Sequence, residues 1–386
     1  MLSLSLDQKK ALAKLLSWQR NPQGGFITFG GYAGTGKSTL IGVLRKKLYE
    51  DEPGLRVAFV SFTGRAARVL KQKIKQQQSL LSQDFVGTIH SLIYSPIIGP
   101  KGEIMGWKRR TAIEFDLIIV DEASMVDEEV WQDLLFYGIP IIAVGDHGQL
   151  PPIRGQFNLM NQPDLRLENI HRQAQDNPII KVATVARKYG VIPALEFSPQ
   201  VLKVEKNNPE TAERVSEWLA NYQPSTLILC GYNHTRVRLN TQIRKNLGFD
   251  SSLPQSGDRV ICLRNNHQAG IYNGMLGTIN FIKKKNKDWY FAEINMDEEN
   301  NLQGGLIAVD QFNHKDGLNF TQERSRTKEG NLFDFGYALT VHKAQGAQSK
   351  KVVLFEERFS RSSDDDWRRW LYTAVTRAEE ELYIVG

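Results

Sequence analysis

The sequence predicts an α/β protein with two lobes, each built around a mainly parallel sheet. Over about the first 160 residues, short apolar runs rich in β-branched residues alternate with longer stretches typical of helices. Continuous apolar runs of this kind are typical of strands that helices cover on both faces of a sheet. The runs are Phe26–Phe29, Val57–Phe62, Phe115–Val120 and Ile139–Val144, and the candidate covering helices are Ala66–Gln77 and Glu128–Phe136.

A second unit of the same kind begins near Leu165 and is interrupted before it ends. The interruption contains short alternating segments separated by Gly, Asn and Asp, a pattern typical of a small antiparallel barrel. In the first unit, two prolines, three glycines and Trp107 indicate a small exposed insertion. We therefore expect a first lobe at 1–164 with an insertion at 91–111, a second lobe at 165–256 and 333–386, and a barrel at 257–332.

Composition restricts the class of protein only mildly. The chain of 386 residues has a formal net charge of +6, which suits a polyanionic partner without requiring one. Its two cysteines, Cys230 and Cys262, are too few for a structural zinc site. No apolar run is long enough for a membrane span, and Asp7, Lys9 and Lys10 do not fit a secretory signal. We expect a soluble, cytoplasmic protein.

A glycine-rich loop is the most specific chemical motif in the sequence. Residues 31–39 read GYAGTGKST, directly after the run Phe26–Phe29 and before a helical pattern. This matches the phosphate-binding pattern G-x-x-x-x-G-K-[ST], in which backbone N–H groups and a helix N-terminus surround phosphate oxygens. Lys37 would reach the β- and γ-phosphates, and Ser38 would bind Mg²⁺. The predicted nucleotide site consists of Gly31, Ala33, Gly34, Thr35, Gly36, Lys37, Ser38 and Thr39.

An acidic pair supplies the second half of the predicted site. The run Phe115–Val120 leads directly into Asp121 and Glu122. Asp121 would hold Mg²⁺, and Glu122 is placed to polarise the attacking water. No N-K-x-D or L-S-G-G-Q-like segment is visible, which disfavours a GTPase and a transporter ATPase. A small-molecule kinase would rarely need a second lobe.

Further motifs follow one another in a fixed order along the chain. They are Gln8 in SLDQKKAL, FTGRAA at 62–67, GTIH at 87–90, GDHGQLPP at 145–152, LENIHRQ at 167–173, YALTVHKAQG at 337–346 and YTAVTRA at 372–378. In order and spacing this series resembles superfamily 1 helicases, specifically the 5′→3′ branch that includes the phage Dda and RecD-like helicases. The resemblance extends from Gln8 to Arg377 and implies two RecA-like P-loop lobes.

The resemblance also implies roles for individual residues. Gln8 would read the adenine edge of ATP, Gln149 would sense the γ-phosphate, and Gly346 would adjoin the nucleotide. Arg172 and Arg377 would be arginine fingers supplied by the second lobe. Single-stranded DNA would lie across both lobes on Phe62, Thr63, Arg65, Thr88, His90, Pro151, Thr340, His342 and Lys343. The insertion at 91–111 takes the place of the pin that parts the duplex, with Ile97, Ile98 and Trp107 as candidate contacts.

These inferences predict a monomeric, ATP- and Mg²⁺-dependent helicase that moves 5′→3′ on single-stranded DNA and unwinds duplex junctions. Two alternatives stay open at this point. One is a translocase that displaces proteins without efficient unwinding, and the other is a non-motor nucleic-acid-binding module switched by ATP. The choice between DNA and RNA, the pathway and the protein partners are not fixed by the sequence.

Overall fold

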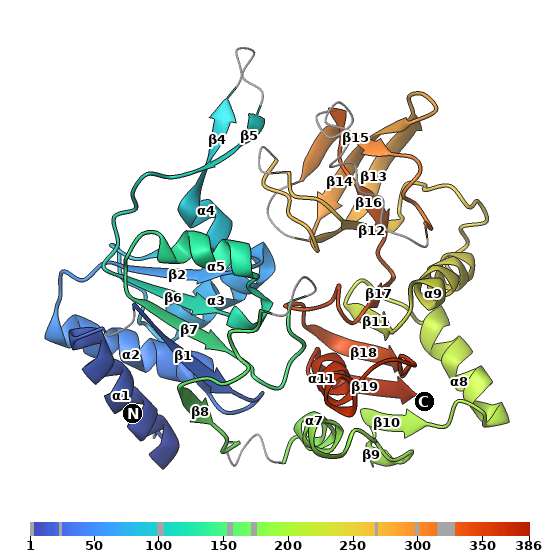
Figure 1. The fold of residues 1–386 in the computed structure, drawn as a ribbon. Coiled ribbons are helices and arrows are strands. Elements are labelled where there is room, and N and C mark those ends of the chain that lie inside the picture. The colour runs from blue at the N-terminus through green and yellow to red at the C-terminus, as the bar shows by residue number, and fades with distance from the viewer. Residues whose placement is uncertain are drawn as a thin grey trace. The chain divides into compact units, whose positions relative to one another are not determined.

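The chain folds into two compact units, Met1–Lys181 and Val182–Gly386 (Figure 1). The computed structural model describes residues 4–22, 25–98, 104–152, 157–170, 176–266, 269–297, 301–314 and 329–386. Within these parts of the chain, no helix is both long and apolar enough to cross a membrane.

The first unit is built on a six-stranded parallel sheet with the order β3-β2-β6-β7-β1-β8. Alternate residues of the central strands face opposite sides, and helices cover both sides. Phe59 and Ile119 pack with α1 to α3, while Val60 and Val120 pack with α4 and α5. The strands are β1 (Phe26–Gly31), β2 (Val57–Ser61), β3 (Phe85–Thr88), β6 (Leu117–Asp121), β7 (Ile141–Gly145) and β8 (Leu165–Leu167). The helices are α1 (Leu6–Arg20), α2 (Lys37–Asp51), α3 (Gly64–Gln76), α4 (Ile89–Ile93) and α5 (Glu128–Leu135), with a 3₁₀ turn at Ala123–Met125.

The boundary between the units differs from the expected one. The sequence suggested that a second unit begins near Leu165, but β8 pairs in parallel with β1 and so belongs to the first sheet. The division falls at Lys181, inside α7 (Pro178–Tyr189). A three-residue strand with Arg166 at its centre has no apolar run to mark it in the sequence.

The second unit holds another six-stranded sheet, with the order β17-β11-β18-β19-β10-β9. All its strand pairs are parallel except the pair of β9 with β10. The strands are β9 (Glu196–Ser198), β10 (Val201–Val204), β11 (Thr226–Cys230), β17 (Ala338–Thr340), β18 (Ser349–Phe355) and β19 (Ala378–Val385). The helices that follow α7 are α8 (Pro209–Ala220), α9 (Asn233–Asn246) and α11 (Asp364–Val375).

The segment expected to be a barrel forms a five-stranded antiparallel sheet with the order β15-β14-β13-β12-β16. A single bridge between Ile307 of β15 and Asn331, just before β16, links the two edges. Because β16 pairs with β12, this inserted sheet extends to Phe335, beyond the expected limit of 332. The strands are β12 (Arg259–Cys262), β13 (Leu276–Lys284), β14 (Trp289–Met296), β15 (Leu302–Ala308) and β16 (Phe333–Phe335).

The insertion in the first unit contains an antiparallel hairpin of β4 (Tyr94–Ile98) and β5 (Ile104–Arg109). Asp133 of α5 anchors both strands, because it accepts a hydrogen bond from the Tyr94 hydroxyl at 2.5 Å and forms an ion pair with Arg109. The Arg109 guanidinium also lies over the ring of Phe136. Farther along the hairpin, Ile97 and Trp107 are exposed. The side chain of Ile98, the third candidate pin residue, is outside the described part.

Candidate nucleotide-binding site

The loop between β1 and α2 has the backbone that phosphate binding requires. Gly34 and Gly36 both have φ of +79°, a left-handed conformation that glycine adopts without steric penalty. A Cβ on Gly31 would lie 2.7 Å from Thr35 Oγ1, so the turn closes tightly at that glycine. The N-cap of α2 is Gly36, which has no side chain to cap the helix. Backbone N–H groups at such a helix start, together with the helix dipole, favour an anion.

The Lys37 ammonium lies beside this loop and is held there by the loop's own carbonyls. Its Nζ donates to the carbonyl oxygens of Gly31 at 2.6 Å and Tyr32 at 3.1 Å. The same atom lies 3.9 Å from Asp146 Oδ2, which follows β7. The ammonium is therefore positioned between the phosphate loop and the end of a neighbouring strand. Sequence reasoning assigned no role to Asp146, whose nearness to Lys37 depends on the order of strands in the sheet.

Asp121 and Glu122 stand at the end of β6, two strands from β1 in the sheet. Burial raises the pKa of Asp121 to about 6, repulsion from Glu122 adds to the shift, and Lys73 and Lys37 oppose it. A cation bound at the carboxylate would favour its ionised form. Glu122 has φ of +54°, a region that is uncommon for non-glycine residues and that is enriched at functional sites.

The loop after β7 packs onto the phosphate loop. The ring of His147 lies 4.1 Å from the ring of Tyr32, measured between centroids. Asp146 is buried, and its Oδ1 accepts a hydrogen bond from Gly148 N at 2.9 Å. Gln149 follows in the same turn and is also buried. Because β6, β7 and β1 are neighbours in a parallel sheet, the predicted residues on these loops meet at one sheet edge.

Gln8 contacts the phosphate loop from α1. Its Nε2 donates to the Thr35 carbonyl at 3.1 Å, and its Oε1 accepts from Ser5 N in a capping box that begins the helix. The amide is buried. The glutamine that the resemblance singled out is therefore adjacent to the loop, although a glutamine in a helix carries little information by itself.

The residues present fit a magnesium–nucleotide complex. In the described ranges, no three His, Cys, Asp or Glu side chains gather in a group able to hold a metal ion. Mg²⁺ bound with a nucleotide does not need such a group, because phosphate oxygens and waters complete its octahedron around one or two protein oxygens. Ser38 at the start of α2 and Asp121 at the end of β6 are the matching donors.

The nucleic-acid candidates of the first unit lie at the ends of β2 and β3, which are neighbours in the sheet. Thr63 and Thr88 cap α3 and α4, since their hydroxyl oxygens accept from Ala66 N and Ser91 N. The ring of Phe62 lies 5.6 Å from the ring of His90 in an edge contact. Arg65 is in the first turn of α3, and Pro151 follows the loop after β7.

His90 differs from its expected character. The sequence treated it as a candidate cation for a phosphate backbone, but burial lowers its pKa below the usual 6.5, with Asp127 opposing the shift. Burial also lowers the pKa of His342 in the second unit. Both imidazoles are therefore mainly neutral near pH 7, so they offer hydrogen bonds and ring surface rather than charge.

Acidification from about pH 7.5 to 5.5 is expected to destabilise the first unit partly through His90. Its folded pKa lies below its unfolded pKa, so stability present above the unfolded value is lost as the pH falls through the folded one. His90→Gln should flatten the pH dependence of the unfolding midpoint of the first unit, and His234→Gln, on α9 of the second unit, serves as a control that alters no residue of the first unit. An unchanged slope in His90→Gln would contradict this account.

In the second unit, the candidates of the late motifs lie around the end of β17. Lys343 N donates to Thr340 Oγ1 at 3.4 Å, and Lys343 Nζ donates to Asn273 Oδ1 at 3.3 Å. Gly346 has φ of +74°, which turns the chain toward β18. Arg377 is buried and donates to the carbonyls of Thr373 and Ala347, so the end of α11 meets this turn. Arg172, the other candidate finger, lies outside the described residues.

The fold and the site define a P-loop nucleotide-binding protein with two parallel-sheet units. Residues 3–204 match the family described as AAA domain, and residues 335–385 match the UvrD-like helicase C-terminal domain. Because the first match covers more than half of the sequence, the chain belongs to the AAA domain family.

Two curated relatives are similar to the chain over most of its length. The ATP-dependent RecD2 DNA helicase of Deinococcus radiodurans is 28% identical over 385 residues, covering 93% of this chain and 47% of the relative. The RecD subunit of the RecBCD enzyme of Buchnera aphidicola is 23% identical, covering 93% of this chain and 69% of the relative. The chain thus spans about half the length of the RecD2 relative. These matches confirm the resemblance to RecD-like superfamily 1 helicases.

Solved structures of Pif1 helicases share the fold. Two coordinating Pif1 helicases at forked double-stranded DNA give a TM-score of 0.54 at 18% identity, with 99% of this chain and 92% of that chain covered. Pif1 helicase from Bacteroides, in complex with ADP-AlF3 and single-stranded DNA, gives 0.53 at 17% identity, with 100% and 92% covered. At these identities the likeness concerns the fold alone. It confirms the α/β class with two RecA-like lobes.

Proposed function

We propose that the chain is an ATP-dependent DNA helicase that moves 5′→3′ on single-stranded DNA and unwinds duplex junctions. The observation that carries this proposal is the meeting of the phosphate loop, the Asp121–Glu122 pair and the Gln149 loop at one edge of the first sheet. The match of residues 335–385 to a helicase C-terminal domain supports a motor rather than a lone nucleotide switch. The direction of movement rests on the family resemblance.

In the proposed reaction, water attacks the γ-phosphorus of ATP and the bond to the ADP oxygen breaks. Lys37 binds the β- and γ-phosphate oxygens, and the N–H groups of the loop surround them. Glu122 accepts the proton of the attacking water. Ser38 and Asp121 would hold Mg²⁺, which supplies charge neutralisation at the phosphates when bound. Gln8 would contact the adenine, and Gln149 would sense the γ-phosphate.

The second lobe is proposed to complete this site. Arg172 and Arg377 would stabilise the charge on the transferring phosphoryl group, and Gly346 would adjoin the nucleotide. Because these arginines come from a separate lobe, hydrolysis would depend on closure of the two lobes. Each cycle of ATP hydrolysis would then be coupled to one closing and one opening movement. We propose that the first lobe, the second lobe and the inserted domain are the functional parts of the chain. Their limits would lie close to those of the two parallel sheets and the inserted antiparallel sheet.

The proposed DNA-binding surface combines aromatic rings that could stack on bases with charged side chains that could contact the phosphate backbone of the DNA. Phe62 and the neutral ring of His90 offer ring surfaces, and Arg65 and Lys343 offer positive charge. Further candidate contacts are Thr63, Thr88, Pro151, Thr340 and His342. Exposed Ile97 and Trp107 on the β4–β5 hairpin make it the proposed pin, with Ile98 as a further candidate. The cellular setting would be the cytoplasm of a bacterium or an infected host, in DNA replication, repair or recombination, with the protein acting as a monomer.

Steady-state ATP hydrolysis with and without single-stranded DNA tests the class of activity. We expect a stimulation of at least about tenfold by DNA, declining steeply with salt because phosphate contacts release counterions. Duplexes with a 5′ or a 3′ single-stranded tail then test strand separation and direction, and only the 5′-tailed duplex should unwind. Absence of DNA stimulation would refute the motor, and unwinding of only the 3′-tailed duplex would refute the direction. Stimulated hydrolysis without unwinding of either duplex would favour the protein-displacing translocase.

A further inference from the structure

Helix α9 carries three buried polar side chains at a spacing of four residues. Arg236, Asn240 and Arg244 are 8%, 0% and 2% exposed. Residues four apart lie on one face of a helix, so the three form a continuous polar stripe. Charged and amide side chains are rarely buried unless they are paired. The stripe therefore needs partners, and these belong to the two segments that connect the inserted sheet with the second parallel sheet.

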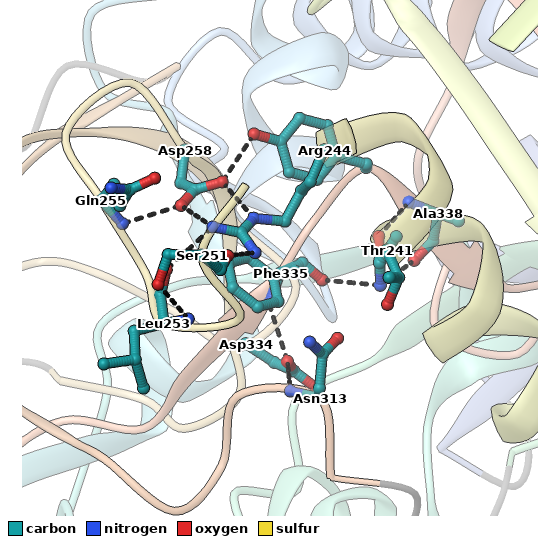
Figure 2. Close-up of polar contacts among 12 residues, drawn as sticks. Thr241, Arg244, Ser251, Leu253, Gln255, Asp258, Asn313, Asp334, Phe335 and Ala338 are labelled. Atoms are coloured by element: carbon teal, nitrogen blue, oxygen red, sulfur yellow. Dashed lines mark hydrogen bonds and ion pairs between the residues drawn. The ribbon is translucent and has the colours of Figure 1, made fainter. Parts of the chain in front are cut away.

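Arg244 binds the incoming segment, residues 251–258. Its guanidinium forms a two-pronged ion pair with Asp258, with Nε at 2.7 Å from Oδ1 and a terminal nitrogen at 2.9 Å from Oδ2. The remaining donors reach the carbonyls of Ser251 at 2.6 Å and Leu253 at 2.8 Å. Asp258 is fully buried and also accepts from Gln255 N at 2.8 Å. Figure 2 shows this guanidinium enclosed by the turn that leads into β12.

The return segment after β16 binds the same ion pair. The ring of Phe335 packs against the Arg244 guanidinium, with 4.2 Å from its central carbon to the ring centroid (Figure 2). The Tyr337 hydroxyl donates to Asp258 Oδ1 at 2.8 Å. Burial and the nearby Asp258 carboxylate raise the pKa of Tyr337, so the hydroxyl keeps its proton at any working pH. The two crossings between the sheets therefore meet at one buried charge pair.

Asn240 and Arg236 extend the attachment along the return segment. Asn240 Oδ1 accepts from Ala338 N at 2.8 Å, at the start of β17. Arg236 forms an ion pair with Asp334 at 2.6 Å and donates to the His314 carbonyl at 2.6 Å. Asp334 in turn accepts from the backbone N–H groups of Asn313 and Phe335 (Figure 2). One face of α9 thus binds the return segment both in β16, through Asp334, and at the start of β17, through Ala338.

We propose that the α9 stripe is a positioning device that locks the inserted sheet to the second parallel sheet, so that both move as one body. The role of this attachment in unwinding rests on the proposed motor function. The rigid attachment itself depends only on the contacts between α9 and the two connecting segments. Two buried ion pairs favour one geometry, because any hinge at the crossings would leave a desolvated charge without its partner. Arg236, Asn240 and Arg244 are positioning residues rather than catalytic ones. They would carry a movement of the second lobe into the inserted sheet.

The distance between two spin labels tests the lock without any need for activity. Labels at Lys284→Cys, on β13, and Glu213→Cys, on α8, span the junction, and the native Cys230 and Cys262 are buried. We expect one narrow distance distribution in the parent and in Thr241→Ala, an exposed control on α9. Arg244→Lys, which loses the fork but keeps the charge, and Asp258→Asn should both broaden it. If Asp258→Asn fails to fold, Arg244→Lys decides alone, and an unchanged narrow distribution in it overturns the proposal.

The second measurement is the number of base pairs unwound per ATP hydrolysed. In Arg244→Lys we expect DNA-stimulated hydrolysis within about twofold of the parent and a several-fold drop in unwinding per ATP. An equal loss of both would overturn the positioning role, because it would indicate general loss of structure. Absence of DNA-stimulated hydrolysis in the parent would refute the motor function instead, and the label distances would still decide whether the lock exists.

Discussion

Glu122→Gln is expected to retain ATP binding and to lower DNA-stimulated hydrolysis by at least about 100-fold, the usual scale for loss of a general base. The amide keeps the shape of the side chain but cannot accept the proton of the attacking water. Lys37, the loop N–H groups and Asp121 are untouched, so the phosphates keep their contacts. The affinity for a fluorescent ATP analogue and single-turnover hydrolysis with excess enzyme separate the two effects.

A matched control is Glu129→Gln, an exposed carboxylate in the first turn of α5. It should hydrolyse ATP at the parent rate, since its side chain is exposed to solvent in the first turn of α5. Turnover of Glu122→Gln within a few-fold of the parent would remove Glu122 from the reaction. A loss of nucleotide affinity with unchanged turnover of the bound ATP would give it a binding role instead.

Asp84→Asn is expected to lower the free energy of unfolding of the first unit by about 3–5 kcal/mol, the usual cost of breaking a buried ion pair. The side chains of Arg45 and Asp84 are both fully buried. Asp84 accepts three contacts from the Arg45 guanidinium and further ones from the backbone N–H groups of Leu81 and Val57. The amide leaves the guanidinium charge without a counter-ion among α2, β2 and the start of β3.

Asp51→Asn supplies the comparison, because Asp51 pairs with Arg20 at the surface at the same kind of distance, 2.7 Å. Exposed pairs contribute only about 0–1 kcal/mol. Hydrogen exchange of the β2 and β6 amides under increasing urea follows the first unit separately from the second. A loss in Asp84→Asn no larger than that in Asp51→Asn would show that the buried pair adds no more than a surface pair.

The central strands could be predicted because they are buried on both faces, and this gives long apolar runs without alternation. β2 and β6 are such strands, and each was expected at its observed place. β8 was not predicted as a strand, because it has three residues and an arginine at its centre. Its membership depends on pairing with β1, which lies more than a hundred residues earlier.

The candidate site was predictable where its chemistry lies in consecutive residues. The glycines around Lys37 and the acidic residues at the end of β6 are of this kind. The approach of Asp146 to Lys37, and of His147 to Tyr32, depends on strand order and could not be read from spacing. The α9 stripe was hidden for another reason, since Arg236 and Arg244 resemble the solvated face of a helix until the fold encloses them.

Asp133 links the β4–β5 hairpin to α5, beside the contact of the Arg109 guanidinium with the Phe136 ring. The Asp133 carboxylate contacts Tyr94 of β4 and Arg109 of β5. The exposed Ile97 and Trp107 lie farther along the hairpin. A force on the hairpin would be transmitted through Asp133 to α5, whose Val130 and Leu134 pack against β6 and β7. Those strands end at Asp121 and at the Gln149 loop. A force on the hairpin would therefore strain β6 and β7, the strands that present the acidic pair and the Gln149 loop.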